Sequence, residues 1–392
     1  MPEVWEDVIV EDLDVEENRD IAGLPIFIVP EHGIGCPHDI SEVPRGSALA
    51  IFRYFFVDIM LETFVTATNA YVEVHLIRGW KKLDLPEFKA FLGIVIHLGI
   101  IHYPSRKHIW STGPSGSVFI RKIMSKDRFE QILKCWHYRD YSRYTEAEIL
   151  EGKASDPFWP VAEFCDLLAN QFNYFWAPAQ GVDIDEQCIP WKGRHKCRCY
   201  NPSKPEKWHF KIFSLNDSRS GYQLNFYPYR GKAEVRPDGV SATAFPAHIL
   251  LHNEKYHHRN YILYTDNWFT SFGQLRILRK RGILFVGTIK SIRSGVPKKT
   301  QGRPRKWLRG EFCTRKALFN GSTVYYTEWQ DKKPVKILHT FNTYKDTCTR
   351  QVRENGRWSR KQYTRPTIIN LYNKGMGVQI QAIKECLTTA RG

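Results

Sequence analysis

The sequence predicts an α+β protein in which a helical half precedes a mixed β-sheet with a parallel half. Apolar residues recur at helical spacing in the first half, whereas alternation with period two begins after Ala177–Pro178. Three strand-like runs then follow one another, and a helix, a strand, a second helix and a further strand come next. Consecutive strands followed by alternating helices and strands are typical of a mixed sheet whose later strands run parallel.

The helical half is expected to contain four helices. They span Ser47–Asn69, a segment that begins after Asp84, Ile120–Tyr138 with a break at Ser125, and Phe158–Trp176. Asp84 is a good N-cap, and Pro86 suits the first turn that follows it. The helix after Asp84 is apolar on nearly all sides, so we expect it to be deeply buried.

The sheet half is expected to contain five strands and two helices. The strands are one that carries Asp183 and Asp185, Trp208–Leu215, Gly221–Tyr229, one that ends at Asp266, and Ile283–Thr288; the helices are Ser241–Asn253 and Ser271–Arg281. This is the order of an RNase H-like fold, whose first and fourth strands lie adjacent and parallel. Asp185 and Asp266 would then meet at the C-terminal ends of their strands, where open α/β sheets place their sites.

Five regions are expected along the chain. Residues 1–45 form an acidic, disordered tail, 46–178 the helical region, 179–289 the RNase H-like core, 290–366 an insertion with strands at Ser322–Glu328 and Val335–Phe341, and 367–392 a divergent C-terminal helix. Met1–Asp20 has few apolar residues, so we expect its deletion to leave the melting temperature nearly unchanged.

The charge distribution favours a polyanionic partner. The chain carries a formal charge of +16, and Met1–Asp20 holds nine acids and one arginine, so the remainder carries +24. Solubility alone is a weaker explanation for so large and so localised an excess. Nucleic acid is therefore the expected partner.

A carboxylate pair next to a cationic segment suggests metal-assisted chemistry on that partner. Asp183 and Asp185 alternate with Val182 and Ile184, so both carboxylates lie on one face of the strand. Such neighbours repel unless a cation lies between them or one takes up a proton. The basic residues that follow are Lys192, Arg194, Lys196, Arg198, Lys204, Lys207 and Lys211. The alternative is a strand end with solvated aspartates and a basic loop.

Other site classes receive less support. Cys188, His195, Cys197 and Cys199 lack the ligand spacing of structural zinc, so we predict no zinc site and, with no signal peptide in the sequence, reduced thiols. The longest apolar run, Ala90–Ile101, is too short to span a membrane. We expect neither a membrane nor a small-molecule substrate as partner.

Six motifs, in order, resemble the piggyBac transposase family over roughly Ser47 to Gly377. They are Ile184–Gln187, Lys192-Gly193-Arg194 with Tyr200, Pro202, Lys204 and Lys207, Tyr229-Arg230-Gly231-Lys232, Thr265–Ser271, Trp329–Lys333, and Tyr372–Gly377. The family transposes DNA by a cut-and-paste reaction at TTAA targets, with Mg²⁺ held by three aspartates. The resemblance therefore implies DNA as partner, a homodimer, and nuclear localisation.

The resemblance also assigns residues. Asp185 and Asp266 match the first two metal ligands and catalytic acids, whereas Gln379 occupies the third position and supplies no acid. The family's C-terminal Cys-rich module has no counterpart in this sequence. Expected nucleic-acid-binding residues are Lys192, Arg194, Lys204, Lys207, Lys211, Arg230, Lys232, Arg303 and Arg305. The last two flank Pro304 as in an AT-hook, although a solvated loop or a nuclear-import tract fits them equally well.

We therefore expect a transposase-derived DNA-binding protein with an incomplete, inactive site, in which Mg²⁺ serves only if the site is competent. One alternative is an active DDE-type nuclease or transposase that uses Asp183 or Glu385 as substitute ligand. A second alternative is a structural adaptor that retains the fold but not DNA binding.

Overall fold

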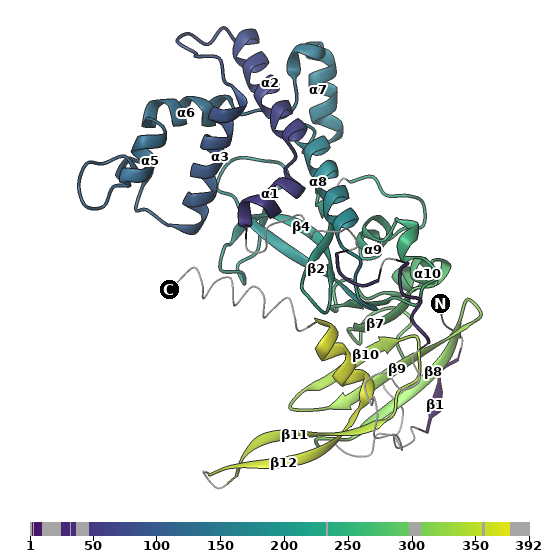
Figure 1. The fold of residues 1–392 in the computed structure, drawn as a ribbon. Helices are drawn as coiled ribbons and strands as arrows, with labels where there is room; N and C mark the ends of the chain where they lie inside the picture. Colours follow the sequence, from purple (N-terminus) through teal and green to yellow (C-terminus); the bar gives the residue numbers. More distant parts are fainter. Residues whose placement is uncertain are drawn as a thin grey trace. The chain divides into compact units, whose positions relative to one another are not determined.

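The computed structural model describes residues 47–232, 234–297, 307–354 and 357–376, together with residue 2 and the stretches 4–9, 25–31 and 33–36. The chain divides into two compact units. One contains the described residues 47–172 and is helical, and the other contains the N-terminal stretches with the described residues from 173 onwards (Figure 1). The predicted mixed α+β class is confirmed. None of the helices in the described ranges is long and apolar enough to cross a membrane.

Aromatic and aliphatic side chains of several short helices form the core of the helical unit. The elements are α1 (Ala48–Phe55), α2 (Asp58–Val74), α3 (Leu85–Ile100), α4 (Arg106–Ile109), α5 (Val118–Ile123), α6 (Lys126–Cys135), η1 (Tyr141–Arg143), α7 (Glu146–Ser155) and α8 (Ala162–Phe175), which continues into the second unit. Phe64, Phe88 and Phe91 lie buried at the centre, with Ile120 and Ile132 around them.

Two expectations for this unit are confirmed and two are not. Asp84 caps α3, and Ser125 separates α5 from α6 by capping the latter. The expected helix Ser47–Asn69 is instead two helices, because the backbone turns extended at Phe56 and Val57, where no Gly or Pro marks a break. Helix α3 is not deeply buried: only its stripe of Phe88, Phe91 and Ile94 is enclosed, since the unit packs against one side of it.

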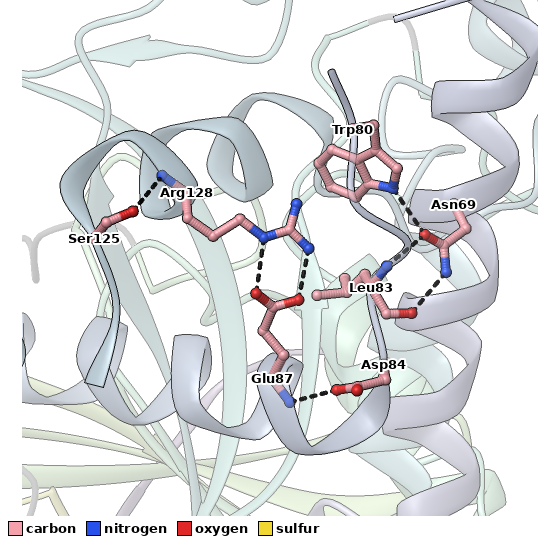
Figure 2. Close-up of polar contacts among 7 residues, drawn as sticks. All are labelled: Asn69, Trp80, Leu83, Asp84, Glu87, Ser125 and Arg128. Atoms are coloured by element: carbon pink, nitrogen blue, oxygen red, sulfur yellow. Dashed lines mark hydrogen bonds and ion pairs between the residues drawn. The ribbon is translucent and has the colours of Figure 1, made fainter. Parts of the chain in front are cut away.

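Polar contacts link α2, α3 and α6 (Figure 2). The buried Asn69 amide accepts from Trp80 Nε1 at 3.0 Å and Leu83 N at 2.9 Å, and donates to Leu83 O at 2.9 Å. Arg128 donates two hydrogen bonds to the Glu87 carboxylate, at 2.8 and 2.6 Å, and its guanidinium lies 4.5 Å from the Trp80 ring. A bidentate, half-buried pair of this kind fixes helix orientation better than a simple surface ion pair does.

One large mixed sheet forms the core of the second unit, in the order β1-β8-β9-β10-β7-β6-β2-β4-β3, with β5 also paired to β4. Its strands are β1 (Glu6–Val8), β2 (Gly181–Pro190), β3 (Cys199–Tyr200), β4 (Trp208–Asp217), β5 (Gln223–Pro228), β6 (Ile262–Thr265), β7 (Leu284–Thr288), β8 (Phe312–Phe319), β9 (Ser322–Gln330) and β10 (Pro334–His339). The remaining elements are α9 (Phe245–Leu250), η2 (Glu254–Tyr256), α10 (Phe272–Lys280), the pair β11 (Lys345–Glu354) and β12 (Arg357–Pro366), and a helical stretch over residues 367–376.

Strands β2, β6 and β7 are parallel neighbours, as predicted for the RNase H-like order. Apolar side chains of these strands such as Ile184, Leu263 and Phe285 are fully buried, because both faces of this central part are covered. The strands of the expected insertion 290–366 divide between two sheets. Strand β10 pairs antiparallel with β7, so β8–β10 extend the same sheet, whereas β11 and β12 form a two-stranded sheet of their own.

The N-terminal acidic segment is not wholly without packing, which corrects the expectation for Met1–Asp20. Strand β1 pairs antiparallel with β8, and Asp7 accepts from Arg315 Nε at 2.8 Å. Trp5 packs edge-on against Phe272 and Tyr326, and its indole nitrogen donates to Gly295 O at 2.9 Å. This docking could not be predicted from the sequence, because it depends on one apolar side chain and on backbone pairing and not on a periodic pattern.

Trp5→Ala is therefore expected to destabilise the sheet unit. Removing a largely enclosed indole should lower the free energy of unfolding by about 2–3 kcal/mol, because apolar burial and a hydrogen bond are both lost. Urea titration followed by circular dichroism measures it. Val4→Ala is the matched control, since Val4 is 83% exposed and adjacent in sequence. An unchanged urea midpoint for Trp5→Ala would show that β1 does not dock in solution.

Candidate metal and nucleic-acid site

Two aspartates meet where the parallel pairing of β2 and β6 ends. Strands β2 and β6 pair in register from Gly181↔Ile262 to Ile184↔Thr265. Asp185 and Asp266 each follow the last of these pairs, and paired strands lie about 4.8 Å apart. Asp266 thus directly follows β6, whereas Asp185 lies in the middle of β2, which continues to Pro190 along β4. The predicted adjacency of the two aspartates is confirmed, but Asp185 is not at the C-terminal end of its strand.

The electrostatics of the pair are those of interacting carboxylates. Burial raises the pKa of Asp185, and the negative charge of Asp266 raises it further. The Glu186 N–H, 2.7 Å from Asp185 Oδ1, and the positive charge of Lys204 act in the opposite direction. A cation between the two carboxylates would relieve this repulsion.

The turn after β6 fixes the second aspartate. Asp266 Oδ1 accepts from Trp268 N at 2.8 Å and Phe269 N at 3.4 Å. Arg293 donates from one side to the carbonyls of Asn267 and Trp268, at 3.2 and 2.7 Å. The sequence did not single out Arg293, because its target is main chain and no motif marks it.

Asp183 lies on the same strand but in a different environment. It is 2% exposed, and its Oδ2 accepts from Asn216 Nδ2 at 3.1 Å. Burial raises the pKa of Asp183 to about 8, so its protonated form prevails near neutral pH. An enclosed, protonated carboxyl is a poor substitute metal ligand, which weakens the alternative that relies on Asp183.

A third segment approaches the aspartate pair. In the helical stretch 367–376, the Tyr372 hydroxyl lies 3.3 Å from Thr288 Oγ1. Burial raises the pKa of Tyr372, and the charges of Asp266 and Asp185 raise it further, so the phenol lies within electrostatic reach of both. Sequence analysis assigned Tyr372 to a motif but gave it no place at the site. Gln379, the expected third position, lies outside the described residues.

The helical stretch packs closely on the central strands. A Cβ at Gly375 would lie 2.5 Å from Cγ and Cδ1 of Tyr264, a buried residue of β6. Only a residue without a side chain allows this approach. Gly375 is thus one reason why Tyr372 lies near the aspartates.

Gly375→Ala is expected to destabilise the sheet unit by about 1–3 kcal/mol, because the added methyl group overpacks the Tyr264 ring. Gly93→Ala in α3 is the matched control, since a Cβ there meets nothing within 4 Å. That control should be neutral or stabilise by about 0.5–1 kcal/mol, as Gly to Ala does in an open helix. Thermal unfolding of each variant measures both effects, and equal changes at the two positions would contradict the packing argument.

The donor set suits a hard cation. Mg²⁺ is commonly bound through one or two carboxylates and keeps several waters, a requirement that Asp185 and Asp266 meet. Within the described residues, no group of three or more His, Cys, Asp and Glu side chains could hold a metal ion. Burial raises the pKa of the Cys188 and Cys199 thiols, which favours their protonated forms over zinc-binding thiolates.

The expected nucleic-acid-binding residues divide into three groups. Lys192, Arg194, Lys204, Lys207 and Lys232 are exposed, and the first four lie on the segment between β2 and β4. Lys211 is partly buried, pairs with Glu186 at 2.7 Å and lies 5.0 Å from the Trp268 ring, and partly buried Arg230 donates to the Tyr227 hydroxyl. Arg303 and Arg305 lie outside the described residues.

The basic segment has internal order. Arg198 lies 4.1 Å from the Trp208 ring and donates to the carbonyls of Lys192 and Gly193, at 3.3 and 3.0 Å. These contacts hold Lys192 and its neighbours in a defined turn. A second cationic feature, absent from the sequence analysis, is an open groove beside Asn267 that Lys290 and Lys336 line.

Comparisons with known proteins connect these features. A family model described as Transposase IS4 matches residues 47–389. PiggyBac transposable element-derived protein 2 of Homo sapiens is 25% identical over 341 residues, which cover 84% of this chain and 54% of that protein. PiggyBac transposable element-derived protein 3 of Homo sapiens is 27% identical over 357 residues, covering 87% and 56%.

Among solved structures, the piggyBac transposase synaptic complex with hairpin DNA superposes with a TM-score of 0.68 at 25% sequence identity. The match covers 86% of this chain and 67% of that one. The chain thus spans about half the length of the curated relatives it matches.

Proposed function

Because the chain belongs to the piggyBac-type transposase family, we propose that it is a transposase-derived DNA-binding protein that does not cleave DNA. The observation that carries the proposal is the parallel register of β2 and β6, which brings Asp185 and Asp266 together next to a basic segment. Binding a phosphodiester backbone needs cations along its path, and metal-assisted chemistry on that backbone needs in addition carboxylates that hold the metal near the scissile phosphate.

The residues of this site would act on DNA by binding and orientation. Lys204 and Lys207 would neutralise backbone phosphates, and Lys204 is within electrostatic reach of Asp185. Asp185 and Asp266 would hold Mg²⁺, which supplies Lewis-acid stabilisation of phosphate charge when bound. The Tyr372 phenol, close to both carboxylates, would orient a water molecule or a phosphate oxygen.

The proposed lack of cleavage follows from the number of acids. A two-metal site needs enough carboxylate to offset both cations near a phosphate. Asp183 is enclosed and bonded to Asn216, Glu186 pairs with Lys211, and Glu385 lies outside the described residues. Among the described residues, the acids that this leaves for a metal are Asp185 and Asp266. At the expected third position, Gln379 is a neutral amide by sequence. We include nuclear localisation, homodimer formation and a TTAA preference in the proposal as consequences of the family relationship.

Measuring the affinity for duplex DNA as a function of salt concentration tests the proposed DNA binding. Affinity should fall with salt at a log–log slope of about −0.9 per phosphate contact, and Lys204→Glu with Lys207→Glu should reduce the slope by about two contacts. Lys280→Glu, a single charge reversal at the end of α10, is the control for net charge. No affinity at low salt would favour the structural-adaptor alternative, and an unchanged slope would show that these lysines face away from DNA.

A strand-cleavage assay with Mg²⁺ and Mn²⁺ tests the proposed lack of DNA cleavage. The unmodified chain is expected to produce at most trace nicking of supercoiled DNA and of duplexes that contain TTAA. Asp266→Ala is the control that separates site chemistry from contaminating nuclease. Strong Mg²⁺-dependent cleavage that Asp266→Ala abolishes would establish an active DDE-type enzyme in place of the proposed one.

A further inference from the structure

The ribbon of β11 and β12 has two faces of different chemistry. Its strands pair antiparallel over their whole length and form a two-stranded sheet of their own. Directly opposed residues share a face, and successive residues alternate between faces. One face, which we call the outer face, consists of four directly opposed cross-strand pairs. Its residues are Thr347, Thr349, Gln351, Arg353, Trp358, Arg360, Gln362 and Thr364. Figure 1 shows the ribbon as a long hairpin that extends from the sheet unit.

The opposite face holds the ribbon to its unit. Cys348 is buried, and the Tyr363 ring lies 4.9 Å from the Arg309 guanidinium. Arg350 pairs with Asp331 at 3.4 Å, and Arg365 pairs with Asp346 at 2.8 Å. Packing and ion pairs therefore occupy the part of this face nearest the large sheet, whereas Arg357, Ser359 and Lys361 on the same face are exposed.

The outer face is exposed along its whole length and contains no acid. All eight of its side chains are exposed, Trp358 to 67%. Among the ribbon side chains that the structure describes, Asp346 is the one carboxylate, and it lies on the opposite face. A surface that serves solubility mixes both charge signs. Threonine, glutamine and arginine without acids instead suit a polyanion whose surface carries hydrogen-bonding groups.

The shape of the ribbon matches the same partner. A two-stranded antiparallel ribbon fits the DNA major groove, which is about 12 Å wide. Residues 347–353 span roughly 23 Å at about 3.4 Å per residue, the length of about seven base pairs. Arginine pairs with the N7 and O6 acceptors of guanine, glutamine with N6 and N7 of adenine, and threonine contacts the thymine methyl group.

We propose that the outer face of the β11–β12 ribbon enters the major groove of duplex DNA, where Gln351, Arg360 and Gln362 contact base edges. The inference rests on the proposed DNA-binding function and assigns to it a sequence-selecting element. Gln351 and Arg360 lie directly opposite each other, so together they span neighbouring positions across the groove. The Lys204 segment contributes phosphate contacts, whereas the ribbon contributes discrimination between sequences.

The first test starts from a duplex that the full chain selects from a random library. Arg360→Ala, and separately Gln351→Ala with Gln362→Ala, should lower the ratio of affinities for the selected and an unrelated duplex by at least about fivefold. Binding to the unrelated duplex should change little. Arg357→Ala is the matched control: it removes the same charge from the same exposed strand, three residues away and on the opposite face. Unchanged melting temperatures confirm that these exposed substitutions leave the fold intact.

The second test probes the groove itself. Replacing guanine or adenine of the selected site by its 7-deaza analogue removes a major-groove acceptor. At the contacted position this should weaken the unmodified chain but not further weaken the variant that lacks the contacting side chain.

Four outcomes would overturn the ribbon proposal. The first is that the ribbon variants lose affinity equally for the selected and the unrelated duplex, and the second is that Arg357→Ala lowers the affinity ratio as much as they do. The third is that no 7-deaza substitution weakens binding by the unmodified chain, and the fourth is that single-stranded RNA competes more strongly than duplex DNA. Each of them leaves salt-dependent binding by the unmodified chain, and thus the proposed function, in place. Absence of any DNA binding by the unmodified chain would instead overturn both.

Discussion

Trp329→Ala is expected to lower the free energy of unfolding of the sheet unit by about 3–5 kcal/mol, the usual cost of removing a buried tryptophan side chain. Trp329 is 1% exposed and packs in a cluster with Ile262, Val286 and Ile368. Its Nε1 donates to Thr364 O at 2.8 Å, which ties β9 to β12. The substitution therefore leaves a cavity and removes this hydrogen bond at the base of the ribbon.

Urea unfolding followed by far-ultraviolet circular dichroism measures this effect. Trp358→Ala is the matched control, because it makes the same change in the ribbon at an exposed position, and it should shift stability by less than about 0.5 kcal/mol. Trp329→Phe keeps most of the ring volume and should fall between the two. Equal destabilisation by Trp329→Ala and Trp358→Ala would contradict the assigned burial.

Acidification is expected to destabilise the sheet unit through His339, which is wholly buried in β10. Its Nδ1 lies 2.7 Å from Phe341 O, so Nδ1 carries the proton of the neutral ring. Its Nε2 lies 2.8 Å from Thr327 Oγ1 and therefore accepts from that hydroxyl. Burial lowers the pKa of His339 from 6.5 to about 4, because a charged ring would lose its hydration, and the hydrogen bond to Phe341 O opposes this only in part.

The sign of this effect follows from the direction of the shift. Asp183 acts in the opposite direction over the same range, because its pKa in the folded chain is raised to about 8. For His339, the unfolded chain takes up the proton near pH 6.5 and the folded chain only near pH 4, so the His339 contribution to stability is complete above 6.5 and falls as the pH drops towards 4. The full loss is about 3 kcal/mol at 1.36 kcal/mol per pKa unit. Urea midpoints at intervals across this range measure it. His339→Asn removes only the His339 contribution, so the stability difference between the unmodified chain and His339→Asn should shrink by about 3 kcal/mol between pH 6.5 and pH 4. A difference that stays constant across this range would assign the acid sensitivity to other groups.

Sequence reasoning succeeded where short-range or general topological rules decide the outcome. Asp84 caps α3 through its own neighbouring backbone, and the adjacency of Asp185 and Asp266 follows from the order of strands and helices. Each of these depends on a pattern that lies within a few residues or on a rule for connecting parallel strands.

Sequence reasoning failed where a single contact between residues far apart in the chain decides the position of a side chain. Trp5 docks because Phe272 and Tyr326 provide a surface that no local pattern reveals. Tyr372 lies within electrostatic reach of the aspartates in a helical stretch whose Gly375 permits close approach to Tyr264, and one glycine in such a stretch carries no signal of this packing. The outer face of the ribbon became visible only with the register of β11 and β12, because its acid-free character depends on which residues lie opposite each other.

The docking of β1 has a consequence for biosynthesis. Asp7 and its partner Arg315 are 308 positions apart, so β1 is translated long before the strand that it must pair with. During that interval the segment has no edge to join, and β8 in turn emerges with its backbone donors and acceptors unpaired on one side. Exposed edges of this kind recruit strands from other molecules. Completion of the sheet by β1 is thus a late step, and nascent chains on one polysome face a period in which they can pair with each other.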